Sequence, residues 1–271
     1  MKRYLNVIIL FLWLSLGMSA LHAATINIMP LGDSITYDSK YGDTRSSSIR
    51  TGYRSHLWYK LKDVGFEANF VGSQIAGEAI IPSFDPHNEG HPGWNQFEIA
   101  EETGTYMNDS KPDIVLLHIG TNDTTTNPAG IDDILSAIDL YESENKKTVD
   151  VYVSLIIDRE HSDPRITAFN NRLAELLRQR IDSGDNIIIV NMFKNAQLTG
   201  SDYADETHPN DSGYAKMANV WFDALTISFN PTLSAYPYTI LAPSSIVTTS
   251  TDANAKTINI IANVPSNGIT F

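Results

Sequence analysis

Three side chains that lie far apart in the sequence have the types that nucleophilic acyl transfer requires. Ser34 stands two residues after Gly32, where the apolar run of residues 26–31 stops. A serine on such a turn can present its hydroxyl to solvent while its own N–H points into the same space. Asp205 lies three residues before His208, so its carboxylate can bond the imidazole N–H that faces away from a substrate. These residues predict a serine nucleophile, a histidine base and an aspartate that orients the base.

Each of these residues also has a purely structural explanation. Asp33 and Ser34 can cap the helix that follows them. His208 can be an ordinary surface-loop histidine, since the chain has seven histidines. Glu206 competes with Asp205 for the orienting role, but adjacent side chains in an extended loop point apart. No single residue decides between the two explanations, so the rest of the chain has to.

Two further residues could supply the N–H donors that a developing oxyanion needs. Asn122 follows the apolar run of residues 113–119 and could aim its side-chain amide at that oxygen. Gly93 has no side chain, so its backbone N–H can come close to a substrate. Asn122 is equally a common turn residue, and Gly93 an ordinary loop glycine. Trp94 could stack on a substrate ring or pack under the loop, and we add Asp33 as a second candidate substrate contact.

The elements that must position these residues are short apolar strands that alternate with amphipathic helices. Such alternation implies right-handed crossovers and a parallel sheet. We therefore predict an α/β fold over residues 25–229, a three-layer α/β/α sandwich that is flavodoxin-like rather than a barrel. The predicted strands are residues 26–31, 68–72, 113–119, 149–156 and 187–190, and the predicted helices are 53–64, 95–107, 130–142, 162–181 and 212–227.

This five-stranded parallel sheet would bring the candidate residues to one rim. Ser34, Gly93, Asn122 and His208 all fall at or near the carboxyl ends of predicted strands, where open α/β sheets place their ligand crevices. Residues 73–93 show no periodicity and contain three prolines. A loop of that length inside a compact domain is usually functional or mobile.

The two ends of the chain differ in texture from the predicted domain. Residues 1–24 combine a basic start, an apolar run over residues 7–18 and small residues before Ala24, which is typical of a secretory signal peptide. The alternative is a membrane anchor, but the apolar run is shorter than the roughly 20 residues that span a bilayer. We expect a secreted or periplasmic bacterial protein without a membrane partner, and the absence of cysteine means that it has no disulfides.

The amino-acid composition argues against nucleic-acid binding and sets residues 230–271 apart from the predicted domain. Nineteen Lys and Arg against 32 Asp and Glu give a formal charge of −13, and such an acidic surface repels nucleic acid. Residues 230–271 are rich in Ser, Thr and Pro and contain one alternating stretch, 256–264. They indicate a linker followed by an incomplete β-segment. A strand pair packed on the first domain is an equal alternative.

Taken together, these motifs resemble a known superfamily. Four segments resemble, in order, the four blocks of the SGNH (GDSL-type) hydrolases: Gly32 to Thr36, Gly93, Gly120 to Asp123, and Asp205 with His208. The resemblance spans residues 28–221. Finer motifs resemble carbohydrate esterase family three, the acetylxylan-esterase-like branch; they are residues 52–54, 70–73, 89–94 and 207–218. Thr51 stands where that branch often has a second glycine, which puts nothing catalytic in doubt.

The resemblance implies a role for each matching residue. Ser34 is the nucleophile, His208 its base and Asp205 the orienting acid. The Ser34 N–H, the Gly93 N–H and the Asn122 side chain form the oxyanion hole. The implied reaction proceeds through an acetyl-enzyme and needs no metal or organic cofactor. Its substrate is an acetylated polysaccharide or oligosaccharide. We expect the protein to be a monomer.

Two other functions remain open. A GDSL lipase or lysophospholipase shares the same blocks, but long acyl chains need an apolar trough, and we find no large apolar cluster between Gly72 and Trp94. A non-catalytic glycan-binding or adhesive module would use the β-segment within residues 230–271. The intact set of candidate catalytic residues argues against that module.

Overall fold

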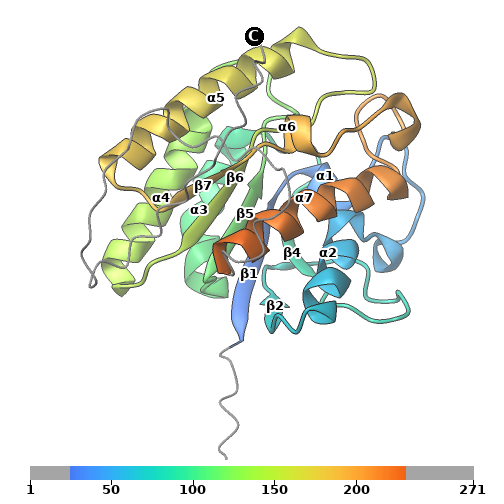
Figure 1. The fold of residues 1–271 in the computed structure, drawn as a ribbon, viewed down its shortest axis with the longest axis horizontal. Helices are drawn as coiled ribbons and strands as arrows, with labels where there is room; N and C mark the ends of the chain where they lie inside the picture. Colours follow the sequence, from blue (N-terminus) through green and yellow to red (C-terminus); the bar gives the residue numbers. More distant parts are fainter. Residues whose placement is uncertain (1–24, 230–271) are drawn as a thin grey trace, which may run out of the picture.

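The computed structural model describes residues 25–229, and Figure 1 shows them as one sheet with helices on both faces. The predicted signal peptide, residues 1–24, and the predicted C-terminal β-segment, residues 230–271, lie outside the described residues. Within residues 25–229, no helix is both long enough and apolar enough to cross a membrane.

The central sheet of the described part of the chain is mostly parallel and has seven strands. The strand order is β3-β4-β1-β5-β6-β7, and β2 also pairs with β1, at its first residues, whereas β4 pairs with its last. All pairs are parallel except β3 with β4. The strands are β1 (Ile26–Gly32), β2 (Ala68–Phe70), β3 (Gln74–Ile75), β4 (His87–Gly90), β5 (Ile114–His118), β6 (Asp150–Ser154) and β7 (Ile187–Val190).

The prediction of five parallel strands is therefore wrong in number, although all five predicted strands are present. Strands β3 and β4 lie inside residues 73–93, which we expected to be a loop. Strand β4 has the sequence His-Asn-Glu-Gly, and three of its four residues are buried. Its polar side chains are satisfied by hydrogen bonds, such as Ser73 Oγ to Glu89. A search for apolar runs cannot find such a strand, because its buried side chains are polar.

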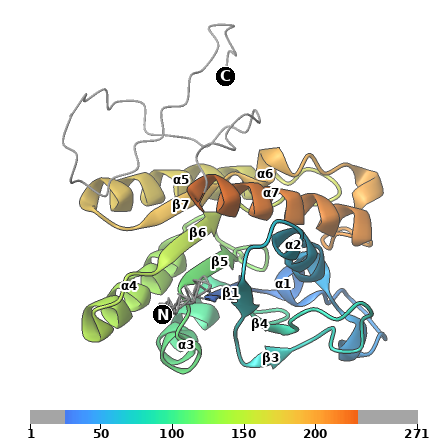
Figure 2. The same cartoon turned by 60° about the horizontal axis from the view of Figure 1, so that its bottom comes forward.

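Residues 25–229 contain seven α-helices, and Figure 2 shows the longer ones in two layers on the faces of the sheet. The seven are α1 (Ser34–Tyr37), α2 (Gly52–Asp63), α3 (Gln96–Ser110), α4 (Ala129–Asn145), α5 (Pro164–Ser183), α6 (Met192–Asn195) and α7 (Asp211–Phe229), with short 3-10 turns η1 (Ser47–Ile49) and η2 (Gly200–Asp202). Helices α3, α4 and α5 cover one face of the sheet, and α2 packs against α7 on the other.

Alternation along the central strands divides the core between these two layers. In β5, Val115 and Leu117 face α3, α4 and α5, whereas Ile114 and Leu116 face α2 and α7. Successive side chains of a strand point to opposite faces, so a strand that is buried on both sides needs apolar residues at every position. The continuous apolar run of β5 follows from that requirement.

Arg54 connects the first helices to the 73–93 segment. Its side chain is fully buried, and its guanidinium donates to the carbonyl oxygens of Thr36, Ala76 and Pro86 at 2.9, 3.0 and 3.1 Å. A further bond reaches the carbonyl of Arg50 at 3.0 Å. Burial lowers the pKa of Arg54 to about 10, so the side chain remains a cation at neutral pH.

We expect Arg54→Met to lower the free energy of unfolding by about 2–5 kcal/mol, because Met supplies no donor to the buried carbonyl groups of Thr36 and Ala76. Arg165→Met is the matched control, since the side chain of Arg165 is 64% exposed and its loss should matter little. Urea unfolding of both variants measures the effect. Equal midpoints for the two variants would show that the Arg54 bonds contribute nothing beyond a surface arginine.

Candidate active site

Ser34 lies at the carboxyl end of the central strand β1, as the first residue of α1. The turn is possible because Gly32 precedes it: a Cβ at Gly32 would lie 2.2 Å from the carbonyl oxygen of His118 and 2.6 Å from Thr36 Oγ1. Only glycine fits such an approach. Ser34 is 6% exposed, and its hydroxyl is directed at a histidine from the far end of the chain.

That histidine is His208, and a hydrogen bond joins the two residues. Ser34 Oγ lies 2.9 Å from His208 Nε2, although 174 positions separate them in the sequence. The other ring nitrogen, Nδ1, lies 2.9 Å from each carboxylate oxygen of Asp205. A carboxylate that accepts from Nδ1–H leaves Nε2 free to accept the proton of the serine hydroxyl. This arrangement can activate Ser34 as a nucleophile.

Asp205 is held by its own loop. Besides the imidazole, its Oδ1 accepts hydrogen bonds from the backbone N–H groups of Thr207 and His208 at 2.8 and 2.7 Å. Partial burial would raise the pKa of Asp205, but these hydrogen bonds outweigh it and keep the pKa below its ordinary value. Glu206, the competing orienter, is exposed. The geometry therefore favours Asp205 for that position.

Arg159, which the sequence analysis missed, holds two parts of the rim together. Its Nη2 donates to the carbonyl oxygen of Thr121 at 3.1 Å, and its Nη1 donates to Thr207 Oγ1. Thr121 precedes Asn122 and Thr207 precedes His208, so one guanidinium spans both turns. Arg159 belongs to no motif, and only the approach of the two turns in space gives it this position.

A stack of three aromatic rings lies under the turn that contains Gly93. The His91 ring stacks on Trp94 at 4.4 Å and on Tyr106 at 5.1 Å between ring centroids. His91 Nε2 lies 2.9 Å from an oxygen of Glu89, whose side chain is 1% exposed. The stack and the buried Glu89–His91 pair fix the position of the Gly93 turn. Neither Glu89 nor His91 was a predicted site residue, although both lie in a motif that the family resemblance used.

Of the expected oxyanion donors, Gly93 lies at this turn and Asn122 is bonded to it from the turn after β5. Gly93 is exposed and has φ +87°, a left-handed conformation that favours glycine. Asn122 is also exposed, and its Nδ2 donates to the carbonyl oxygen of Trp94 at 2.8 Å. An amide NH2 has two donors, so one remains for another acceptor. The structure thus links Asn122 to the residue that follows Gly93.

The two expected substrate contacts have different positions. Asp33 is 0% exposed, and its Oδ1 accepts from the N–H of Ile35 at 2.9 Å. Asp33 therefore caps α1, and its burial is incompatible with the direct substrate contact that we expected. Trp94 is partly buried and packs against the core and His91, which agrees with the packing alternative. Among residues 25–229, no group of three or more His, Cys, Asp and Glu is arranged to hold a metal.

A mostly parallel α/β sandwich with a serine, a histidine and an aspartate in hydrogen-bond contact at the carboxyl rim defines a serine hydrolase class. Residues 28–221 match the family described as GDSL-like Lipase/Acylhydrolase. The match covers most of the chain, and the chain belongs to this family. The resemblance to the SGNH hydrolases that the motifs indicated is confirmed.

The chain is also similar to individual proteins of known sequence or structure. The chain is 29% identical over 231 residues to a multidomain esterase of Ruminococcus flavefaciens, which covers 75% of this chain but only 29% of that protein. The structure of this chain is similar to that of a Clostridium thermocellum family 3 carbohydrate esterase, with a TM-score of 0.64 and 28% sequence identity. The match covers 77% of this chain and 98% of the esterase chain. An acetyl esterase mutant with an acetate ion gives TM-score 0.60 and 26% identity over 78% and 100% of the two chains.

Asp33 generates a prediction about pH. Burial of its carboxyl raises the pKa from 3.8 to about 7, against the effect of the hydrogen bond from Ile35. The folded protein keeps a proton on Asp33 at pH values where the unfolded chain has already released it. The contribution of Asp33 to the free energy of unfolding is therefore fully present below the unfolded pKa and is lost as pH rises through about 7. Relative to Asp33→Asn, the wild type should lose roughly 2–4 kcal/mol of stability between pH 4 and pH 7.

Chemical unfolding of both proteins at pH 4, 5.5 and 7 measures this difference. Taking the difference between two chains that are otherwise identical cancels the other titrating groups. A difference that stays constant across the three pH values would show that Asp33 has the same pKa in the folded and unfolded states.

Proposed function

We propose that this chain is a secreted serine esterase that removes O-acetyl groups from a polysaccharide. The observation that carries the proposal is the 2.9 Å contact of Ser34 with His208, together with the bonds of His208 to Asp205. The similarity to a family 3 carbohydrate esterase over 98% of its length supports carbohydrate as the substrate class. The signal-peptide pattern of residues 1–24 supports export.

The proposed reaction follows from the positions of these side chains. His208 Nε2 takes the proton of Ser34 Oγ as this oxygen attacks the ester carbonyl, and Asp205 stabilises the imidazolium that forms. The imidazolium then protonates the departing sugar oxygen, which breaks the ester bond and leaves an acetyl-enzyme. Water, deprotonated by His208, attacks the acetyl group, and acetate leaves as Ser34 regains its proton.

The developing negative charge needs donors that are already in place. In the proposal these are the N–H groups of Ser34 and Gly93 and the second N–H of Asn122. Asn122 is suited to the role because its bond to the Trp94 carbonyl at 2.8 Å fixes the plane of its amide. Donors that are positioned before the reaction cost no reorganisation when charge develops.

Release of acetate from acetylated xylan, mannan and pectin tests the proposed function directly. We expect acetate from at least one polymer with the wild type and none above background with Ser34→Ala, which lacks the nucleophile. A wild type that releases no acetate from any of them, while it cleaves a small acetate ester, would contradict the polysaccharide as substrate. A protein inactive on every ester would favour the non-catalytic glycan-binding alternative.

Acyl-chain length separates the proposal from the lipase alternative. In the 73–93 segment, Ile75 and Ile81 are exposed, but single exposed hydrophobic residues do not make a trough. We expect kcat/KM for p-nitrophenyl acetate to exceed that for p-nitrophenyl octanoate, since a chain without an apolar wall gains none of the ~0.8 kcal/mol available per buried methylene. Constant or rising values from acetate to octanoate would favour a lipase.

Asn122→Ala tests the oxyanion role. We expect kcat to fall by about 10²–10³ with KM nearly unchanged, the usual loss for one oxyanion donor. Asn108→Ala is the matched control, because Asn108 is also exposed and donates one side-chain bond to a carbonyl, that of Gly104 at 2.8 Å. The thermal midpoint and kcat are measured on the same samples. A lowered midpoint with normal kcat would make Asn122 a turn residue only.

A further inference from the structure

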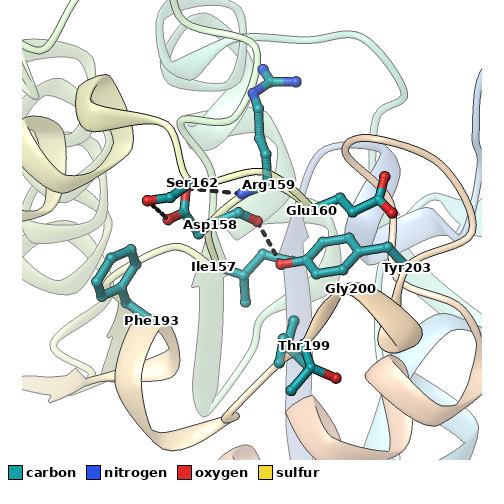
Figure 3. A pocket seen from close by; sticks show the side chains of 10 residues that line it. Ile157, Asp158, Arg159, Glu160, Ser162, Phe193, Thr199, Gly200 and Tyr203 are labelled. Atoms are coloured by element: carbon teal, nitrogen blue, oxygen red, sulfur yellow. Dashed lines mark hydrogen bonds between the residues drawn. The ribbon is translucent and has the colours of Figure 1, made fainter.

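A pocket of 190 Å³ lies beside residues 204–210, which we call the His208 loop, and Figure 3 shows the pocket from close by. One wall comes from the loop after β6 and the other from α6 and the segment that leads into η2. Both segments leave the carboxyl ends of strands, as the turn of Ser34 does. The side chains that matter for its chemistry are Asp158, Arg159, Glu160, Ser162, Phe193 and Tyr203. We call it the Tyr203 pocket.

Residues that line the Tyr203 pocket contact the His208 loop directly. Tyr203 forms a β-bridge with Pro209, the residue after His208. Its hydroxyl donates to the carbonyl oxygen of Asp158 at 2.8 Å. On the opposite wall, the Glu160 N–H donates to the carbonyl oxygen of Glu206 at 3.0 Å. A molecule in this pocket would therefore touch the same segments that hold the catalytic imidazole.

The wall formed by residues 158–163 is ordered by its own hydrogen bonds. Asp158 Oδ1 accepts from the N–H groups of Arg159 and Asp163, each at 2.9 Å. Its other oxygen accepts from Ser162 Oγ at 2.8 Å, which Figure 3 shows as a dashed line. A ligand that binds here does not have to order the loop first, so less binding free energy is lost.

The lining combines aromatic rings with free hydrogen-bonding groups. Phe193 and Tyr203 are half-buried and offer ring surface to the apolar C–H face of a sugar. Ser162 and Tyr203 already donate their hydroxyl hydrogens to the protein, so their oxygens can accept from sugar hydroxyls. The exposed Glu160 carboxylate has no hydrogen bond or ion pair among the described residues.

The position of the pocket indicates which part of an ester it would hold. In the proposed reaction His208 protonates the departing oxygen, so the alcohol half of the ester lies on the His208 side of Ser34. The Tyr203 pocket adjoins His208, because Tyr203 forms a bridge with Pro209 and Glu160 bonds to Glu206. We infer that the Tyr203 pocket binds a sugar unit of the glycan chain that carries the acetyl group. This inference rests on the proposed function and adds where the glycan binds.

Gly200 offers a way to fill the pocket without disturbing the backbone. It lines the pocket, and a Cβ added there would meet only the Glu160 side chain, at 3.9 Å, an ordinary contact. Gly200→Trp should therefore place its ring against Glu160 and in the pocket. The matched control is Gly104→Trp on α3, where a Cβ meets no atom within 4 Å.

Two substrates with the same acyl group separate the pocket from the reaction centre. Acetate release is measured from an acetylated xylo-oligosaccharide and from ethyl acetate, whose alcohol half is only two carbons long. We expect Gly200→Trp to raise KM for the oligosaccharide by about tenfold, as the loss of one or two good contacts would, with kcat/KM for ethyl acetate unchanged. Gly104→Trp should change neither. An unchanged KM for the oligosaccharide with Gly200→Trp would overturn the inference.

Glu160→Gln decides the result if Gly200→Trp impairs both substrates and so disturbs the His208 loop. This variant keeps the shape of an exposed side chain and removes only its charge. We expect a several-fold higher KM for the oligosaccharide alone, and no change would overturn the inference. A wild type that cleaves ethyl acetate but no acetylated oligosaccharide would overturn the proposed function as well, whereas a failure of the variants alone leaves that function standing.

Discussion

The active-site rim depends on the close approach of β1 and β5 at Gly32. A Cβ there would lie 2.2 Å from the carbonyl oxygen of His118, so no other residue allows the two strands to pair to their ends. Strand β1 also pairs with β2 and β4, and the carbonyl oxygen of Gly32 accepts from the N–H of His91 at 2.9 Å. The turns that carry Ser34, Gly93 and Asn122 therefore leave the sheet next to one another.

Buried polar groups, rather than apolar packing, connect the 73–93 segment to this frame. Arg54 donates to the carbonyl groups of Ala76 and Pro86, and Glu89 accepts from Ser73 and lies against His91. Leaving one partner of such a buried network unpaired costs more than the net gain from forming it. That asymmetry gives a polar segment one defined conformation, and through the His91 stack it sets the position of the Gly93 turn.

His208, the proposed base, lies on the His208 loop, between β7 and α7, and β7 is the strand at one end of the sheet. The position of His208 is set by Asp205 within the loop, by the bond of Arg159 to Thr207 and by the β-bridge of Tyr203 to Pro209. Arg159 donates to both Thr121 and Thr207, so the turns of the proposed base and of the proposed oxyanion donor are held by the same side chain. The proposed glycan pocket adjoins the same segments, so in the proposal the sugar binds beside the group that protonates it.

Sequence by itself determined the parts of this protein that local chemistry and periodicity control. The apolar runs predicted β1, β2, β5, β6 and β7, and the parallel order follows from their alternation with helices. The side-chain types of Ser34, Asp205 and His208, with the three-residue spacing of the last two, predicted a contact that the structure shows at 2.9 Å. These features are local, because each depends on a few neighbouring residues.

Only the tertiary structure decided what depends on partners distant in the chain. Strand β4 is polar, so periodicity could not reveal it, and its burial becomes visible only with Arg54 and Ser73 in place. Asp33 has the same sequence context whether it contacts a substrate or caps a helix, and its 0% exposure decided for the cap. Arg159 lies in no motif, and its two contacts exist because separate loops meet at one rim. Burial and long-range hydrogen bonds are properties of the packed chain, so no local pattern encodes them.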